Sequence, residues 1–132
     1  MTKKICRVLI VEDNEEIQAL LADAFLGEGY RFAAAADGRE MRQALAENDA
    51  DIVVIDVLLP GGETGLALAR EAAARGCGVI LITGHPGQIE AVHQSGHPFL
   101  AKPFRLEALL QLVDRVLAET KAACEVRGKR YG

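Results

Sequence analysis

Three acidic side chains stand at the ends of apolar runs in this chain of 132 residues. Glu12 and Asp13 follow the run from Val8 to Val11, and Asp56 follows the run from Ile52 to Ile55. Apolar runs bounded by polar residues are typical of strands that are buried on both faces of a parallel sheet. Open α/β folds bind their ligands at the carboxyl ends of such strands. We therefore interpret the acids as parts of a site rather than as contributions to stability.

The chemistry that these acids suggest is phosphoryl transfer assisted by a metal ion. Three carboxylates within ~4 Å of one another repel by several kcal/mol, and either a proton or a cation must offset that repulsion. Mg²⁺ suits the purpose, because it binds one or two carboxylates and leaves room for a phosphoryl oxygen. Lys102 and Thr83 end two later apolar runs and would hold further phosphoryl oxygens, while Gly84 leaves space beside them. No motif marks an activated serine, cysteine or histidine, so the best nucleophile is Asp56, which would form an acyl phosphate.

The elements that must position these residues alternate between strand and helix five times. This alternation predicts a parallel sheet with helices on both faces, joined by right-handed crossovers. We expect a flavodoxin-like three-layer α/β sandwich with five helices and the strand order 2-1-3-4-5, which brings the acids, Thr83 and Lys102 to one edge. Asn14 and Asp37 are expected to cap the first two helices. The predicted strands are 5–11, 30–35, 51–55, 78–82 and 98–101, and the predicted helices are 14–27, 38–48, 64–75, 86–95 and 105–122.

Composition describes one globular domain and excludes several classes of protein. Half of the residues are hydrophobic and 26% are charged, and the net charge of −4 gives no general attraction to nucleic acid. No apolar stretch approaches the roughly 20 residues that cross a bilayer, and the first residues lack the pattern of a signal peptide. Cys6, Cys77 and Cys124 form no metal-ligand pattern. We therefore predict reduced thiols, a cytoplasmic location, and neither a membrane nor a nucleic acid as direct partner.

Taken in order, these residues resemble the receiver domain of two-component response regulators over about residues 5–120. The resemblance implies that Asp56 accepts a phosphoryl group from a phosphohistidine on a histidine kinase or a histidine phosphotransfer protein. It also implies a Mg²⁺ site made by Glu12, Asp13, Asp56 and the backbone carbonyl of Leu58. Such a protein is not a classical enzyme, but a chain that phosphorylates itself and loses the group slowly. The matching pieces are Glu12-Asp13, Asp56, Leu59-Pro60, Thr83-Gly84 and Lys102-Pro103-Phe104.

The same resemblance implies a conformational switch. Thr83 is expected to turn toward the new phosphoryl group, and Phe99 is expected to move into the space that Thr83 vacates. Phe99 lacks the hydroxyl of the commoner tyrosine, so packing alone would govern its movement. The peptide between Lys102 and Pro103 is expected to be cis, which would aim the lysine into the site.

The histidines and two departures from the family pattern carry further expectations. The three histidines form no metal pattern and are expected at the surface, but His85 follows Thr83 closely. We hypothesise that His85 and Leu58 tune the access of water and hence the lifetime of the phosphoryl group. The segment from 56 to 65 is one residue longer than usual, which should lengthen a loop and leave the nucleophile intact. The segment from 83 to 99 is short and rich in glycine and proline, which predicts a brief or irregular fourth helix.

We predict that residues 1–122 form a stand-alone receiver and that 123–132 form a short basic tail, with no output domain. Phosphorylation would then change a surface that is read by a downstream protein target, with a homodimer as a second candidate assembly. The alternative is an interaction module that keeps the receiver fold but no longer switches, which the short fourth helix favours. A third candidate, a small hydrolase with an aspartyl nucleophile, needs a general acid that the residues just after Asp56 do not supply.

Overall fold

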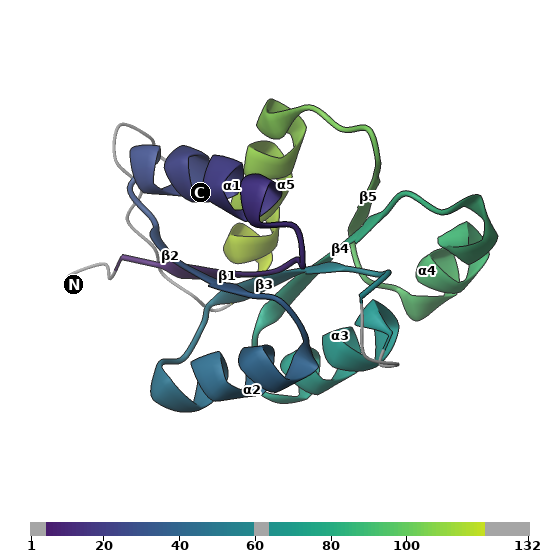
Figure 1. Ribbon diagram of the computed structural model, residues 1–132, viewed down its shortest axis with the longest axis horizontal. Coiled ribbons are helices and arrows are strands. Elements are labelled where there is room, and N and C mark those ends of the chain that lie inside the picture. The colour runs from purple at the N-terminus through teal and green to yellow at the C-terminus, as the bar shows by residue number, and fades with distance from the viewer. Residues whose placement is uncertain (1–4, 60–63, 121–132) are drawn as a thin grey trace.

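The computed structural model describes residues 5–59 and 64–120, which form one sheet covered by helices (Figure 1). All strand pairs are parallel and the order is β2-β1-β3-β4-β5, so the predicted flavodoxin-like fold is confirmed. The strands are β1 (Arg7–Val11), β2 (Arg31–Ala35), β3 (Ile52–Asp56), β4 (Gly78–Thr83) and β5 (Phe99–Ala101). The helices are α1 (Glu15–Gly27), α2 (Gly38–Glu47), α3 (Gly65–Ala74), α4 (Ile89–Ser95) and α5 (Leu106–Glu119), and a 3-10 helix η1 (Pro86–Gln88) precedes α4.

Alternate side chains of the sheet belong to two separate hydrophobic clusters. Ile10 and Val54 lie in the cluster that includes side chains of α1 and α5, whereas Leu9 and Val53 lie in the cluster that includes those of α2, α3 and α4. Figure 1 shows α1 and α5 above the sheet and α2 and α3 below it. Every residue of β3 and β4 is buried. Burial on both faces explains why these strands read as apolar runs in the sequence.

Side-chain caps set the beginnings of the first three helices. The Asn14 side chain accepts hydrogen bonds from the backbone N–H groups of Glu16 and Ile17, as predicted. The Asp37 carboxylate accepts the Glu40 N–H, so it also caps its helix as predicted. Thr64 caps α3 in the same way. Because each cap satisfies a backbone donor that would otherwise lack a partner, these caps determine where the loops from the sheet edge end.

The fourth helix is brief, as the sequence predicts. The segment begins as the single turn of η1, continues as the seven residues of α4, and ends at Gly96, which has a φ of 79°. Within the described residues no side chain caps the N-terminus of α4. A positive φ ends the helix at little cost because glycine has no Cβ.

Three predictions concern the ends of the chain and the thiols. The predicted basic tail at 123–132, Cys124 and the last two residues of the predicted fifth helix lie outside the described residues. Cys6 is buried and disulfide-bonded, so the prediction of reduced thiols is wrong for this residue, because linear spacing does not reveal which thiols meet in a fold. Cys77 is free and half-buried.

No helix in the described ranges has the length and apolar character needed to span a membrane.

Candidate functional site

The ends of the four neighbouring strands β1, β3, β4 and β5 place the predicted site residues at one edge of the sheet. In register, Val11 of β1 lies beside Ile55 of β3, and Asp56 lies beside Ile82 of β4. Glu12 is the next residue after β1. Thr83 ends β4 beside Ala101, so Lys102 follows at the same level. The convergence is thus a consequence of the parallel register.

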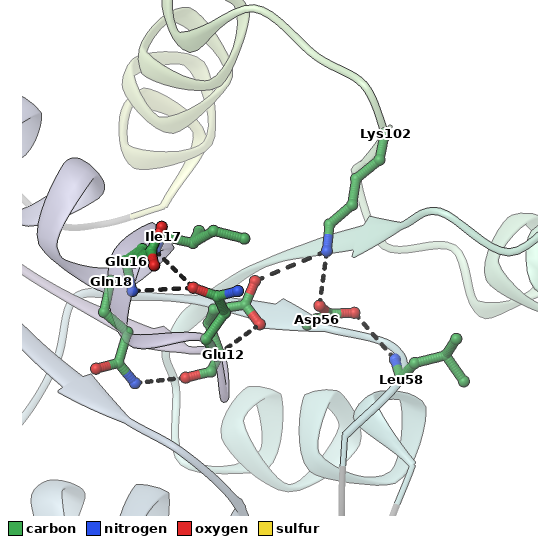
Figure 2. Close-up of polar contacts among 8 residues, drawn as sticks. Glu12, Glu16, Ile17, Gln18, Asp56, Leu58 and Lys102 are labelled. Atoms are coloured by element: carbon green, nitrogen blue, oxygen red, sulfur yellow. Dashed lines mark hydrogen bonds and ion pairs between the residues drawn. The ribbon is translucent and has the colours of Figure 1, made fainter.

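Asp56 is the central residue of this edge, with 8% of its surface exposed. Its Oδ2 accepts a hydrogen bond from Lys102 Nζ at 2.9 Å, and its Oδ1 accepts one from the Leu58 N–H at 3.0 Å. Figure 2 shows Lys102 reaching down between Asp56 and Glu12. Both carboxylate oxygens therefore have a partner, which is what a buried charge requires.

Three carboxylates crowd around the end of Lys102. Glu12 Oε1 lies 3.7 Å from Lys102 Nζ, and carboxylate oxygens of Glu12, Asp13 and Asp56 all lie within 4.8 Å of one another. Glu12 and Asp56 are buried, whereas Asp13 is exposed. These three residues are the only group of three or more potential metal-ligating side chains within the described residues. The excess of negative charge over the single ammonium, together with the all-oxygen donor set, fits a hard divalent cation.

The crowding of these charged groups shifts the pKa values of Glu12 and Lys102. Burial, the charge of Asp56 and a hydrogen bond with Asp13 raise the pKa of Glu12 from 4.5 to about 6, although Lys102 acts in the opposite direction. Burial would lower the pKa of Lys102, but the hydrogen bond and charge of Asp56, with the charge of Glu12, raise it above its usual value. Lys102 is therefore a fixed cation, and Glu12 is the acid at which a proton would compete with any bound cation.

Glu12 is held by contacts within the β1–α1 connection. Its side chain accepts the Asn14 N–H at 3.4 Å, and its backbone carbonyl accepts a hydrogen bond from the Gln18 side-chain amide (Figure 2). Sequence reasoning missed Gln18. A signal was present, since a long amide side chain in the first turns of a helix is well placed to reach back to the loop before it. Gln18 thus fixes the backbone that carries both Glu12 and Asp13.

Two glycines permit the close approaches on which the site depends. A Cβ atom on Gly65 would lie 2.3 Å from the Asp56 carbonyl oxygen, so only glycine lets α3 begin against the end of β3. A Cβ atom on Gly84 would lie 3.2 Å from Lys102 Cδ, so the predicted space beside the site is occupied by the lysine chain itself. The Lys102–Pro103 peptide is cis, as expected. The loop that we predicted to be lengthened includes 60–63, which lie outside the described residues.

Comparison with known proteins identifies the family. The model of the response regulator receiver domain matches residues 8–114. The chain belongs to this family.

Several relatives agree with this assignment. The TorCAD operon transcriptional regulatory protein TorR of Escherichia coli K12 is 32% identical over 114 residues, which are 83% of this chain and 49% of TorR. The aerobic respiration control protein ArcA of the same strain is 32% identical over 117 residues, 86% of this chain and 49% of ArcA. The chain therefore spans about half the length of these curated relatives.

Solved receiver structures share the fold. The crystal structure of the TorR receiver domain is 31% identical with a TM-score of 0.78, covering 88% of this chain and 99% of that one. The response regulator TrrA from Thermotoga maritima, solved in complex with Mg²⁺-BeF, is 25% identical with a TM-score of 0.75, covering 85% of this chain and 99% of that one.

The residues expected to form the receiver's switch lie just beyond the acidic cluster. Thr83 is 1% exposed, and its hydroxyl oxygen accepts the His85 N–H at 3.4 Å. His85 is exposed as predicted, but its ring turns toward its own helix, where Nδ1 accepts the Gly87 N–H at 3.2 Å. Phe99 is half-buried and contacts the ring of His93, which sequence reasoning did not anticipate.

An apolar recess of about 480 Å³ opens beside Asp56 and Lys102 on the α1 side of the receiver. Its floor is the sheet, and its rim includes Leu20, which is 60% exposed. A volume of this size is typical of ligand-binding clefts. Besides the site residues, the lining of the recess includes Ile17 and Leu20 of α1, Ile82 of β4, Pro103 and Phe104 between β5 and α5, and Leu106 at the start of α5.

Proposed function

We propose that this receiver accepts a phosphoryl group on Asp56 from a phosphohistidine of a partner protein and signals by the surface change that follows. One observation carries the proposal: Asp56 is a nearly buried carboxylate that is paired with Lys102 at 2.9 Å beside two further acids. A purely structural ion pair would not need the two additional carboxylates, since their repulsion costs stability. The cluster is therefore best explained as a site for a cation and a phosphoryl group.

In the proposed reaction an oxygen of Asp56 forms a bond to phosphorus, and the phosphorus–nitrogen bond of the phosphohistidine breaks. The electron pair of that bond stays on the imidazole of the donor. Lys102 is already within hydrogen-bond distance of Asp56, so its ammonium lies close enough to pair with the incoming phosphoryl oxygens. The Leu58 N–H keeps the carboxylate oriented during the attack. This preorganisation requires little movement of charged groups at the moment of transfer.

The site fits Mg²⁺, with Glu12, Asp13 and Asp56 as carboxylate ligands and the backbone carbonyl of Leu58 as a further oxygen ligand. The raised pKa of Glu12 supports this set, because burial and the charge of Asp56 both disfavour an ionised Glu12 unless a cation is bound beside it. When bound, the ion supplies positive charge that stabilises the transferring phosphoryl group. The solved complex of TrrA with Mg²⁺-BeF is consistent with this assignment.

The apolar recess supports a protein as the phosphoryl donor. A small ester or inorganic donor has nothing to bury there, whereas a protein helix carrying a phosphohistidine presents aliphatic side chains on the same face. Because the recess includes Glu12, Asp56 and Lys102 in its lining, a side chain docked there would place the donor directly over the nucleophile. A histidine kinase or a histidine phosphotransfer protein has the required form.

The output is proposed to be a rearranged surface near Thr83 and Phe99, read by a downstream protein. The phosphoryl group adds negative charge that Thr83 and Lys102 would hydrogen-bond, and such local electrostatic changes bias bistable elements. Action as a stand-alone receiver and assembly as a homodimer stay predictions, since the curated relatives are about twice as long as the segment that they share with this chain.

The direct test is transfer of labelled phosphate from a phosphorylated histidine phosphotransfer protein. Asp56→Asn should abolish labelling, while Asp49→Asn, the same substitution at an exposed position, should leave it unchanged. Labelling of Asp56→Asn at the rate of the natural chain would refute the assignment of the nucleophile.

The interaction module that no longer switches is the second candidate, and the brevity of α4 favours it. Titration with beryllofluoride, a phosphoryl analogue, in the presence of Mg²⁺ separates the two functions. A switching receiver should bind the analogue and change its amide resonances around Thr83 and Phe99. A module that binds partners constitutively should show no such change.

A further inference from the structure

The ring of His93 on α4 lies against the ring of Phe99 on β5. The two ring centroids are 4.8 Å apart and the planes make an angle of 72°, which is an edge-to-face arrangement. His93 is otherwise exposed, and Phe99 is half-buried against the cluster below the sheet. Edge-to-face pairs contribute stability beyond the area that they bury, because the positive edge of one ring meets the negative face of the other.

The segment from His85 to Ser95 contacts both residues expected to form the switch. At one end the His85 N–H donates to the Thr83 hydroxyl oxygen at 3.4 Å, and the His85 ring caps η1 through the Gly87 N–H. At the other end His93 packs on Phe99. A displacement of either Thr83 or Phe99 therefore disturbs the same short segment.

Few other contacts hold α4 in place. Among its seven described residues only Val92 is buried, and no side chain in the described part of the chain caps its N-terminus. A helix of two turns is far below the length that is stable by itself in water. Elements with few buried contacts are the ones that shift at low cost, and the His93–Phe99 contact is one of the few that position α4, together with the burial of Val92.

We propose that His93 is a positioning residue that holds Phe99, and with it α4, in the resting arrangement of the receiver. The proposal rests on the proposed phosphorylation of Asp56. When Thr83 turns toward the phosphoryl group, Phe99 moves into the vacated space and the two rings separate. The released α4, with the freed face of His93, is then the surface that differs between the two states. In this proposal the ring of His93 on α4 sets the resting position of Phe99, which has no hydroxyl of its own to do so.

Nuclear magnetic resonance of the His93 ring protons tests the contact directly. In the resting receiver these protons should carry a ring-current shift from Phe99, which Phe99→Leu removes. Addition of beryllofluoride and Mg²⁺ should move the His93 signals of the natural chain to the positions found in Phe99→Leu. Asp56→Asn should show no change. Binding of beryllofluoride without movement of the His93 signals would overturn the proposal and leave the function of Asp56 intact, whereas absence of binding would overturn both.

The affinity for beryllofluoride tests whether the contact opposes the switch. A ligand that prefers the active state binds more tightly when the resting state is destabilised. His93→Ala should therefore lower the apparent dissociation constant by roughly 2- to 10-fold, the range expected from loss of one edge-to-face pair. His93→Phe retains a ring edge and should stay within about twofold of the natural chain, as should Gln94→Ala, an exposed substitution on the same helix. An unchanged or weaker affinity of His93→Ala, or an equal gain in His93→Phe, would contradict the proposal.

Discussion

The pKa of Glu12 predicts that binding of Mg²⁺ depends on pH in a way that can be calculated. Metal ligands must be deprotonated, so protonation of Glu12 weakens binding. The apparent dissociation constant is multiplied by one plus the ratio of protonated to charged Glu12. With a pKa of about 6, this factor is about 11 at pH 5 and close to 1 at pH 7.5. If Glu12 kept its usual pKa of 4.5, the factor at pH 5 would be only about 1.3.

Isothermal titration calorimetry is the suitable assay, because the chain has no tryptophan to report binding by fluorescence. Affinities measured at pH 5 and pH 7.5 should differ about 10-fold through Glu12 alone. Glu12→Gln removes the titrating group and shows the pH dependence that all other groups contribute. At pH 6, titration in two buffers of different ionisation enthalpy should also detect release of about half a proton for each Mg²⁺ bound.

Two results would refute the reasoning. One is an affinity of the natural chain that falls no more steeply toward pH 5 than that of Glu12→Gln. The other is release of fewer than about 0.1 protons at pH 6, which is what a carboxyl near its usual pKa would give. The same linkage affects stability with a definite sign. The folded, metal-free protein holds an extra proton between 4.5 and about 6, so its free energy of unfolding falls by up to about 2 kcal/mol as pH rises through that window.

Further predictions concern a glycine and a histidine beside the site. Gly65→Ala should lower the free energy of unfolding by about 1–3 kcal/mol in denaturant titration, because its Cβ would collide with the backbone of Asp56. Gly27→Ala, whose Cβ would meet nothing within 4 Å, should cause no loss, and equal behaviour of the two variants would disprove the collision. His85→Ala removes the ring that caps η1 next to Thr83, and it should speed loss of the phosphoryl group roughly twofold or more because a loosened η1 admits water to the site. His97→Ala, at a position that lines a pocket with residues of α3 and α4, should not change the rate. An unchanged rate for His85→Ala would dismiss the role of His85.

The fold and the gathering of the acids were predictable because one physical rule governs both. Apolar runs such as Ile52 to Ile55 reveal buried strands, and alternation with helices imposes a parallel sheet whose carboxyl ends meet. Once the strand order is known, Glu12, Asp56 and Lys102 must arrive at one edge, and the structure places them within ion-pair distance. The shortness of the fourth helix was also predictable, because Gly96 and the prolines around it disfavour helix locally.

The contacts that sequence reasoning missed arise between side chains of different elements. Nothing in the order of residues shows that the Gln18 amide meets the Glu12 carbonyl or that His93 meets Phe99. The disulfide of Cys6 was missed for the same reason. The role of Gly65 was predictable only in part. Its position at the start of a helix can be inferred from the sequence, whereas its approach to the Asp56 backbone requires the three-dimensional structure. Period and spacing thus predict elements, and tertiary geometry decides their contacts.

Under the proposed function, the arrangement of charges would let one lysine serve both the resting and the phosphorylated site. Within the described residues, Lys102 is the only cation that pairs with the cluster, and it lies nearer to Asp56 than to Glu12, at 2.9 Å against 3.7 Å. In the structure this pairing gives the buried Asp56 carboxylate a charged hydrogen-bond partner. In the proposed acyl phosphate Asp56 itself would lose its charge, and the phosphoryl oxygens a bond length or two away would carry charge instead. The ammonium can follow that charge with a small torsional movement, so the pair is exchanged rather than broken. Glu12 and Asp13 gain no such partner, and a proton or a cation must still relieve their repulsion. Under the proposed function, a bound cation would therefore support phosphorylation.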